Sequence, residues 1–397
     1  MSFIVKPNIL LPIKNIDMKK WAVIACDQFT SEPEYWDKLK SIVDNVPSTY
    51  HLILPEAYLD SDMKHKVDKV NSNMQLYLTH NMFEEHEGFI LVERKTPFVK
   101  RRLGLVIAID LDEYQYEPGK VGRIRATEKT VPERIPPRVK IRENAPIELP
   151  HVLVLIDDKL DLVINDLYKR KKDYELLYNF DLNMNGGHVK GYKIDDTDSI
   201  IKRIENLSSD ISLIVGDGNH SLASAKVCWE NIKNTLPDEE LIDHPARFAL
   251  VELISLYDEG LTFEPIHRVL FNVDEDLITG LKSILSGEEE LKLFTGNEEI
   301  VISVPDNPFT SIKIIQDYLD KYLETHPESE IDFIHGLKNI KSLVKKTENS
   351  VGITMPPLKR DLLLPYIREF GVLPRKSFSL GEAEEKRYYL EGKRILK

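Results

Sequence analysis

Apolar residues along this chain fall into two patterns, short continuous runs and stretches with helical spacing, which together predict strands mixed with helices. A short apolar run or a strict apolar and polar alternation predicts a strand. Such runs occupy residues 21–26, 88–93, 102–111, 151–157, 192–194, 213–215, 248–255 and 264–271. Asn185-Gly186-Gly187 is typical of a hairpin turn and precedes one of these runs.

Apolar positions three or four residues apart predict helices between the strands. Helices are expected at 34–44, 60–78, 161–178, 197–207, 221–233, 275–285 and 311–325. Another is expected at 127–134, with Pro136-Pro137 ending it, because proline has no amide hydrogen and disfavours helix before it. Short strands and proline-rich turns are expected from 351 to 387.

This order of elements predicts an α+β fold with mixed sheets, flanking helices and two interlocked lobes. Residues 1–275 are expected to form the α+β core, and residues 276–397 a C-terminal α+β lobe. The chain is long enough to bury a large core, since 42% of its 397 residues are hydrophobic.

The charge balance changes which ligands are expected. The net charge of -13 opposes generic attraction to nucleic acid or anionic lipid and favours small-molecule ligands. The two cysteines, Cys26 and Cys228, are far apart in sequence, so neither a disulfide framework nor a zinc knuckle is predicted. No secretory signal or membrane-spanning run is found, and a cytoplasmic protein is expected.

The segment Leu213-Ile214-Val215-Gly216-Asp217-Gly218-Asn219-His220-Ser221 combines a strand, two glycines and the start of a helix. Glycines let the backbone approach a ligand, and the first helical amides favour an anion. An anion pocket is therefore predicted, with Gly216, Gly218, Asn219 and Ser221 binding substrate. Asp217 and His220 are candidate catalytic residues. The alternative is a tight turn in which Asp217 or Asn219 caps the helix.

A basic segment provides the second candidate feature. Residues 120–142 contain eight Lys or Arg and two Glu. Its arginines suit phosphate or carboxylate and are expected in part to line the pocket. The candidates are Arg123, Arg125, Arg134, Arg138 and Arg142. The alternatives are a surface strip paired with acidic residues, and nucleic-acid binding, which the overall charge opposes.

Three further positions carry candidate chemistry. Asp27 follows an apolar strand, where a carboxylate can act as general base or bind a metal, although a loop role is equally compatible. His267 and Arg268 are neighbours in a predicted strand and should face opposite ways, so one of them is expected to reach a pocket. His151 begins a strand, and a structural role is expected for it.

Common phosphate-loop, dinucleotide-binding, zinc-protease and GxSxG hydrolase motifs are absent from the sequence. With these residues in view, the chain resembles the DUF1015 family of bacterial and archaeal proteins. The segments that carry the resemblance are Gly122–Glu128, Arg134–Arg138 through Leu149-Pro150-His151, the turn at 216–221, and His267-Arg268. The resemblance covers nearly the whole chain and does not specify a reaction.

A looser resemblance connects the turn with ParB-like free serine kinases. Many DUF1015 members have Asp-Gly-His-His-Arg here, and the similar turn of those kinases handles phosphate. Asp217, Gly218 and His220 match that sequence, whereas Asn219 replaces a histidine and Ser221 replaces the arginine. Because a phosphate clamp is lost, the resemblance implies either a substitute such as Arg123, Arg125 or Arg138, or another substrate. By position only, Asp27 corresponds to the carboxylate that acts on serine.

The sequence therefore predicts an enzyme for a small phosphorylated or carboxylated metabolite, with phosphoryl transfer to or from serine as one reaction. A kinase-like phosphotransferase or a phosphatase fits, with Mg²⁺ and a nucleotide or pyrophosphate as the cofactors to consider. The alternative is a non-catalytic sensor of nucleotides or phosphometabolites. The hypothesis requires the amides after Val215 and the arginines of 123–142 to converge on one anion. Oligomeric state is not predicted.

Overall fold

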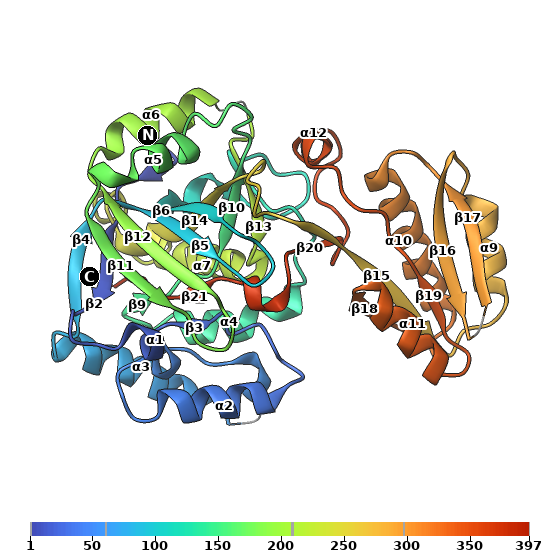
Figure 1. Ribbon diagram of the computed structural model, residues 1–397, viewed down its shortest axis with the longest axis horizontal. Coiled ribbons are helices and arrows are strands. Elements are labelled where there is room, and N and C mark those ends of the chain that lie inside the picture. Colours follow the sequence, from blue (N-terminus) through green and yellow to red (C-terminus); the bar gives the residue numbers. More distant parts are fainter. Residues whose placement is uncertain (1, 60–61, 208–209, 297, 397) are drawn as a thin grey trace. The chain divides into compact units, whose positions relative to one another are not determined.

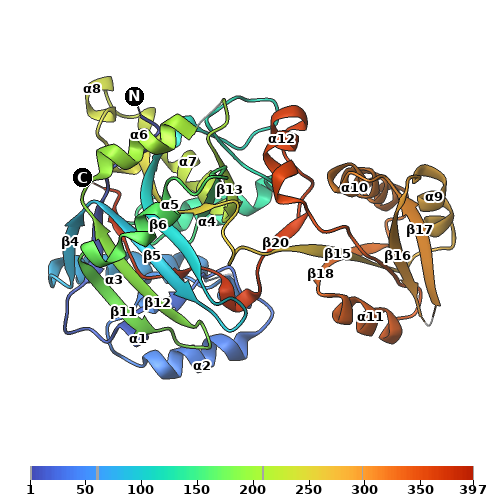
Figure 2. The ribbon, with the colours of Figure 1, turned by 45° about the horizontal axis from the view of Figure 1, so that its top comes forward.

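The structure is a computed structural model that describes residues 2–59, 62–207, 210–296 and 298–396. Contacts divide the chain into two compact units, whose elements are drawn in Figures 1 and 2. The first unit contains Met1–Ala126, Thr130–Leu261 and Glu382–Lys397. The second contains Thr127–Lys129 and Thr262–Gly381. The expected division at residue 275 stays a prediction, and the contacts group residues 262–275 with the second unit.

The first unit is built on a mixed sheet of ten strands in the described chain, in the order β11-β12-β5-β6-β14-β10-β13-β8-β7, with β1 beside β6. The strands are β1 (Ile4–Val5), β5 (Phe89–Lys95), β6 (Arg102–Asp110), β7 (Tyr114–Gln115), β8 (Ile124–Arg125), β10 (Leu153–Ile156), β11 (Leu176–Asp181), β12 (His188–Ile194), β13 (Leu213–Asp217) and β14 (Phe248–Ser255). The pairs β10–β14, β8–β13 and β7–β8 are parallel.

The antiparallel pair of β10 and β13 positions the glycine turn. Leu153, the first residue of β10, pairs with Asp217, the last residue of β13. The start of one strand and the end of the other therefore meet at the same edge of the sheet. Residues just before β10 and just after β13 lie side by side as a result.

Helices flank this sheet in the first unit (Figure 1). They are α1 (Met18–Trp21), α2 (Pro33–Val43), α3 (Met63–Thr79), α4 (Ile135–Arg142), α5 (Ile164–Lys169), α6 (Thr197–Leu207), α7 (Asn219–Lys233) and α8 (Asp238–Leu241). Helix α7 follows the glycine turn and packs against α4. The basic segment thus contributes a helix beside the one that begins at the turn.

Three short strand pairs connect distant parts of the first unit. They are β2 (Asn8–Pro12) with β4 (Phe83–Glu87), β3 (Val23–Ile24) with β21 (Tyr388–Tyr389), and β9 (Ile147–Glu148) with β22 (Lys393–Arg394). The last residues of the chain therefore return to the first unit. There they bring residues near 388 beside residues near 24.

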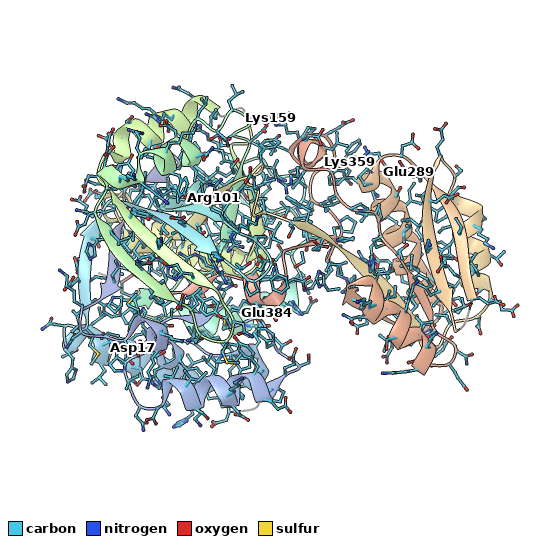
Figure 3. The ribbon with its side chains drawn as sticks, viewed as in Figure 1. Asp17, Arg101, Lys159, Glu289, Lys359 and Glu384 are labelled. Atoms are coloured by element: carbon cyan, nitrogen blue, oxygen red, sulfur yellow. The ribbon has the colours of Figure 1, made fainter. Side chains whose placement is uncertain are left out.

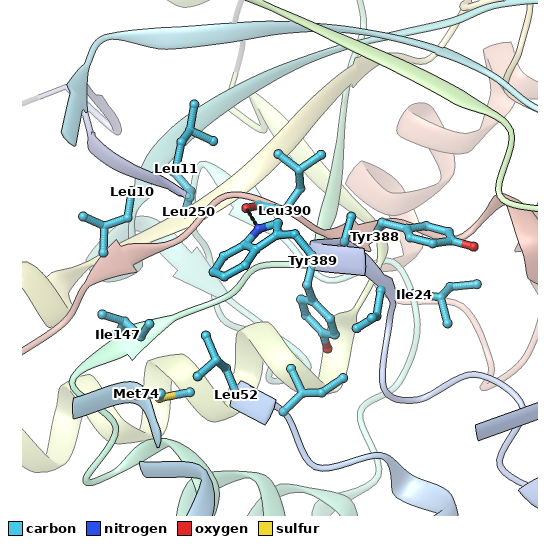
Figure 4. Close-up of a cluster of buried hydrophobic side chains, with 14 of the residues drawn as sticks. Leu10, Leu11, Ile24, Leu52, Met74, Ile147, Leu250, Tyr388, Tyr389 and Leu390 are labelled. Carbon is cyan, nitrogen blue, oxygen red and sulfur yellow. Dashed lines mark hydrogen bonds between the residues drawn. The ribbon is translucent and has the colours of Figure 1, made fainter. Parts of the chain in front are cut away.

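Buried side chains hold this returning segment. The cluster in Figure 4 includes Ile24, Leu52, Ile147, Leu250 and the segment Tyr388–Leu390. The indole nitrogen of Trp21, also in this cluster, donates a hydrogen bond of 2.9 Å to the Leu390 carbonyl oxygen. Burying these side chains stabilises the segment because each removes apolar surface from water.

Buried arginines fix the same segment through its backbone and carboxylates. Arg94 donates hydrogen bonds to the carbonyl oxygens of Glu384, Glu385 and Lys386. Arg387 pairs with Glu252 and Glu391, each at 2.7 Å. Buried charges need such partners, because an unpaired one would carry a large desolvation cost. The segment around Lys386 is thus held from both sides.

The second unit has an antiparallel sheet of six strands among the described residues, in the order β17-β16-β19-β15-β18, with β20 also beside β15. The strands are β15 (Phe263–Phe271), β16 (Glu289–Thr295), β17 (Glu298–Val304), β18 (Glu330–His335), β19 (Val351–Ile353) and β20 (Phe378–Leu380). Its helices are α9 (Asp276–Ile284), α10 (Pro308–Thr325), α11 (Leu337–Lys346) and α12 (Arg360–Phe370). Asp17, Lys159 and Glu289, labelled in Figure 3, illustrate the exposed charged side chains of both units.

The α+β class with mixed sheets and flanking helices is confirmed. The helix expected at 127–134 is wrong: a 3-10 turn covers Pro132–Arg134 and α4 begins at Ile135. Its two prolines occupy the first turn, where their missing amide hydrogens cost no helical hydrogen bond. The helix expected at 161–178 is also too long, because β11 starts at Leu176 and pairs with β12. Helix α12 was not expected.

Candidate functional site

The glycine turn has the strand-to-helix geometry that its sequence predicts. Val215 and Asp217 pair with consecutive residues of β10, which leaves Gly216 as the extra residue of a bulge. Gly218 has a φ of 81°, and a Cβ there would lie 3.0 Å from Val152 Cγ2. A side chain at 218 would therefore be strained by the backbone conformation and crowded by Val152. Helix α7 starts at the next residue, Asn219.

Asp217 has its carboxylate fixed by two donors. Its Oδ1 accepts a hydrogen bond of 3.0 Å from the Gly218 amide, and its Oδ2 accepts one of 2.9 Å from Lys386 Nζ. The Asp217 and Lys386 side chains are 24% and 10% exposed. The lysine comes from the returning C-terminal segment, so the charge of the turn is balanced by a residue that sequence analysis did not select.

His220 has one ring nitrogen committed to the backbone. Its Nε2 lies 3.1 Å from the Val131 amide nitrogen, which can only donate. In the neutral ring the proton is therefore on Nδ1. The contact ties the turn to the basic segment, because Val131 lies between Arg125 and α4.

His151 lies at the centre of a hydrogen-bonded cluster beside the turn. Its Nε2 is 3.0 Å from Ser221 Oγ, and its Nδ1 is 2.8 Å from the Tyr389 hydroxyl. The carboxylate of Asp27 is 3.8 Å from the same Nε2. A structural role, which the sequence led us to expect for His151, does not account for all of its contacts, since its ring lies next to three polar side chains. One feature of the sequence pointed to His151: Leu149-Pro150-His151 is among the segments that resemble the DUF1015 family.

Asp27 follows β3 and faces this cluster. Burial tends to raise the pKa of its carboxyl group, but the nearby His151, the Gln28 amide, Lys386 and Arg138 outweigh burial and lower the pKa. Asp27 is therefore ionised at neutral pH. A buried carboxylate of this kind can accept a proton or stabilise a neighbouring cation.

Cys26, the residue before Asp27, has a thiol of low reactivity. Burial first, and then the Asp27 charge, raises the pKa of its thiol to about 11. Its sulfur accepts a hydrogen bond of 3.0 Å from the Tyr389 hydroxyl, and its amide donates to the same hydroxyl at 3.2 Å. Cys26 helps to hold Tyr389 and exists almost entirely as the thiol at neutral pH.

A cavity of about 150 Å³ opens beside Ser221 and His151. Apolar side chains form most of its wall: Leu52, Ile53, Leu54, Met74, Ile141, Ala145, Ile147, Leu149, Val152, Leu222, Ala225, Ala249 and Leu250. Arg138 and Arg142 of α4 also line it, paired with Glu56 and Glu148 respectively. Two arginines of the basic segment therefore reach the same cavity as Ser221.

The other arginines of this segment lie elsewhere. The Arg123 guanidinium stacks 4.1 Å from the Phe3 ring centre, beside the start of β13 rather than its end. Arg125 is buried next to Ile214, the second residue of β13. Arg134 is exposed, and its carbonyl oxygen accepts a hydrogen bond from Arg138. The structure brings Arg138 and Arg142 together with the turn and places Arg123 at the opposite end of the strand.

His267 and Arg268 belong to the second unit and have partners there. His267 Nδ1 accepts a hydrogen bond of 3.1 Å from the Met355 amide, and burial lowers the pKa of the imidazole to about 4. Arg268 donates to Gln316 and to the Lys376 carbonyl, and burial lowers its pKa to about 10. These contacts give both residues a packing role within that unit.

Possible metal ligands gather in one place among the described residues. Asp274, Asp276 and His326 of the second unit have ligand atoms within 4.8 Å of one another, and both carboxylates are exposed. Asp27 and Asp217 are not part of such a group. No described helix has the length and apolar character to cross a membrane.

The DUF1015 family model, described as a protein of unknown function, matches residues 10–353. The chain therefore belongs to the DUF1015 family. A search of curated proteins gave no match.

Solved structures similar to this chain include a conserved hypothetical protein from Pyrococcus furiosus, with 13% identity and a TM-score of 0.38 over 70% of this chain and 90% of that one. A free serine kinase in complex with AMP has 11% identity and a TM-score of 0.40, covering 71% and 90%. C-terminally truncated SbnI from Staphylococcus aureus has 9% identity and a TM-score of 0.41, covering 73% and 87%.

Proposed function

We propose that this protein is an enzyme that acts on a small anionic metabolite, with phosphoryl transfer to or from the hydroxyl of serine as the reaction to test first. The observation that carries the proposal is that Ser221, at the end of the turn, lines one cavity with Arg138 and Arg142, and that Asp27 lies 3.8 Å from His151, which also lines it. Serine is chosen because of the sequence resemblance at Asp217, Gly218 and His220.

Each group has a chemical role in this proposal. Asp27 is assigned as the general base, because it is ionised at neutral pH and a carboxylate can accept the proton of a substrate hydroxyl. Lys386 provides positive charge near the turn, and Asp217 holds that ammonium in place. The first turn of α7 favours an anion through its dipole. His220 would stabilise the transferring group.

Charge pairing on α4 sets a condition for binding. Arg138 and Arg142 already neutralise Glu56 and Glu148, so an incoming phosphate or carboxylate would compete with these carboxylates. Of the two, Arg138 also acts on the pKa of Asp27. We therefore assign Arg138 to the substrate anion. Mg²⁺ with a nucleotide or pyrophosphate would supply the phosphoryl group and its charge neutralisation.

The experiment is a phosphorus NMR assay of the purified chain with Mg²⁺ and serine plus ADP, ATP or pyrophosphate in separate samples, and with phosphoserine alone. Transfer or hydrolysis is expected in at least one sample. Asp27→Asn should lower its rate by about a hundredfold or more, the usual contribution of a general base. Asp238→Asn, which makes the same change at an exposed site, should retain the wild-type rate.

The outcomes separate the proposal from a sensor. Binding of one of these ligands without conversion would replace the enzyme with a sensor module. Conversion that is unchanged in Asp27→Asn and in His220→Ala would remove the assigned roles while keeping the activity. Absence of both binding and conversion would overturn the proposal for this substrate class.

A further inference from the structure

Ser221, His151 and Tyr389 form a hydrogen-bonded chain whose protons can be assigned. The Tyr389 hydroxyl has one proton and two acceptor positions. Its proton is directed to Cys26 Sγ, and the Cys26 amide donates to one acceptor position. The position that remains accepts a hydrogen bond from His151 Nδ1, at 2.8 Å. We therefore assign the imidazole proton to Nδ1.

This tautomer prepares Ser221 for deprotonation. With the proton on Nδ1, His151 Nε2 carries a lone pair and lies 3.0 Å from Ser221 Oγ. The serine hydroxyl then donates to a ring nitrogen whose other side is held by a third group. This is the arrangement by which a histidine activates a serine nucleophile. The fixed tyrosine takes the place of the carboxylate that usually orients the ring.

Asp27 supplies the charge that proton transfer requires. When His151 accepts the serine proton, Nε2 becomes a donor and the ring becomes a cation. The Asp27 carboxylate, 3.8 Å from that nitrogen, then stabilises the imidazolium. The three groups come from the loop after β3, the residues before β10 and the first turn of α7, so the strand pairing described above brings them together.

The cavity beside Ser221 indicates what the serine would attack. It has a mainly apolar wall, and its charged side chains are already paired with one another. An apolar cavity of this volume is large enough for a group of about six carbons, since engineered cavities of about 150 Å³ bind benzene. A neutral ester with a short acyl chain fits the apolar part of this wall.

We propose that Ser221 is a nucleophile for acyl esters, with His151 as its general base, Tyr389 as the positioning residue and the cavity holding the acyl group. Ser221 Oγ bonds to the acyl carbon, the ester C–O bond breaks, and the proton taken by His151 goes to the leaving alcohol. Water then hydrolyses the acyl serine and releases the acid. The positive end of α7 stabilises the oxyanion. This activity does not rest on phosphoryl transfer.

The first test is covalent labelling of the full chain with a fluorophosphonate probe, located by peptide mass spectrometry. We expect labelling at Ser221, no labelling in Ser221→Ala, and a rate at least about a hundredfold lower in His151→Gln, which keeps a polar side chain but no base. Ser41→Ala is the matched control, because Ser41 is an exposed serine of helix α2 outside the cavity and its replacement should leave labelling unchanged.

The second test uses p-nitrophenyl esters of two, six and twelve carbons. kcat/KM should be highest for the six-carbon ester, and Ala225→Phe should lower it for that ester by at least about tenfold more than for acetate, because the new ring occupies the cavity. Tyr389→Phe should both lower the labelling rate and alter its pH profile, which a purely structural loss of the hydroxyl would not do.

The proposal is overturned if the wild-type chain is not labelled while a known serine hydrolase in the same assay is, or if Ser221→Ala is labelled as fast as the wild type. Circular dichroism of Ser221→Ala establishes that it is folded. No nucleotide or Mg²⁺ is added in these tests. Labelling of Ser221 without phosphoryl transfer in the NMR assay would support this proposal and not the proposed function. Phosphoryl transfer without labelling of Ser221 would support the proposed function and not this proposal.

Discussion

Lys386 donates a hydrogen bond of 2.9 Å to Asp217, which joins the glycine turn to a residue 169 positions later in the chain. Both side chains are more than three-quarters buried. The Asp217 carboxylate is therefore neutralised only when the C-terminal segment that contains Lys386 is folded against the rest of the first unit.

A double-mutant cycle with Asp217→Asn and Lys386→Met should show a favourable coupling of about 1–2 kcal/mol in the free energy of unfolding, because each single change leaves a shielded charge without its partner. Urea unfolding measures it. Lys6 and Glu87, 2.7 Å apart and much more exposed, are the control pair and should couple less strongly. Equal coupling in both pairs would contradict the structural importance of this contact.

Gly218→Ala should be more destabilising than Gly119→Ala. Both glycines have a positive φ, 81° and 79°, which costs an alanine about 1–2 kcal/mol. Only at 218 would the new Cβ also press on Val152, whereas at 119 it meets nothing within 4 Å. The difference between the two variants in urea unfolding isolates the crowding at the turn. A Gly119→Ala variant as unstable as Gly218→Ala would refute it.

Cys26 should react slowly with iodoacetamide in the folded protein. At pH 8, a thiol pKa of about 11 in place of 9 leaves about a hundredfold less thiolate. Asp27→Asn should speed the reaction, since the Asp27 charge contributes to the raised pKa. A Cys228→Ser background leaves one thiol to follow by mass spectrometry. Fast labelling of folded wild-type protein would contradict the burial of this sulfur.

Lys393 should make stability depend on alkaline pH. Burial, opposed by Glu148, lowers its pKa to about 8, against about 10.5 in the unfolded chain. Between these values the unfolded state binds more protons, so the wild type gains stability as pH rises from 8 to 10.5. Lys393→Met lacks this gain.

The stability difference between wild type and Lys393→Met should therefore grow in favour of the wild type between pH 7.5 and 10, as measured by urea midpoints. Lys14→Met, at an exposed side chain, should follow the wild-type pH dependence. Parallel pH curves for the wild type and Lys393→Met would show that the amine is not buried in the way the structure describes.

Local patterns in the sequence were sufficient for much of the fold and for the turn. Helical spacing placed α6 at Thr197–Leu207, and the apolar run at Phe248–Ser255 is β14. These predictions succeed because periodicity and glycine chemistry act over a few neighbouring residues. The same reasoning failed at α4. Pro136 and Pro137 were expected to end a helix, but they lie in the first turn of one, where proline is tolerated.

The partners of the turn could be decided only by the tertiary structure. His151, Tyr389 and Lys386 are separated from Ser221 by 70 or more residues, and no local pattern marks them as its neighbours. Strand pairing decides their meeting: β10 against β13 brings His151 beside the turn, and β21 against β3 brings Tyr389 beside Cys26. The sequence by itself determined the glycine turn between a strand and a helix, because that geometry depends on neighbouring residues, whereas long-range packing determined which side chains lie beside the turn.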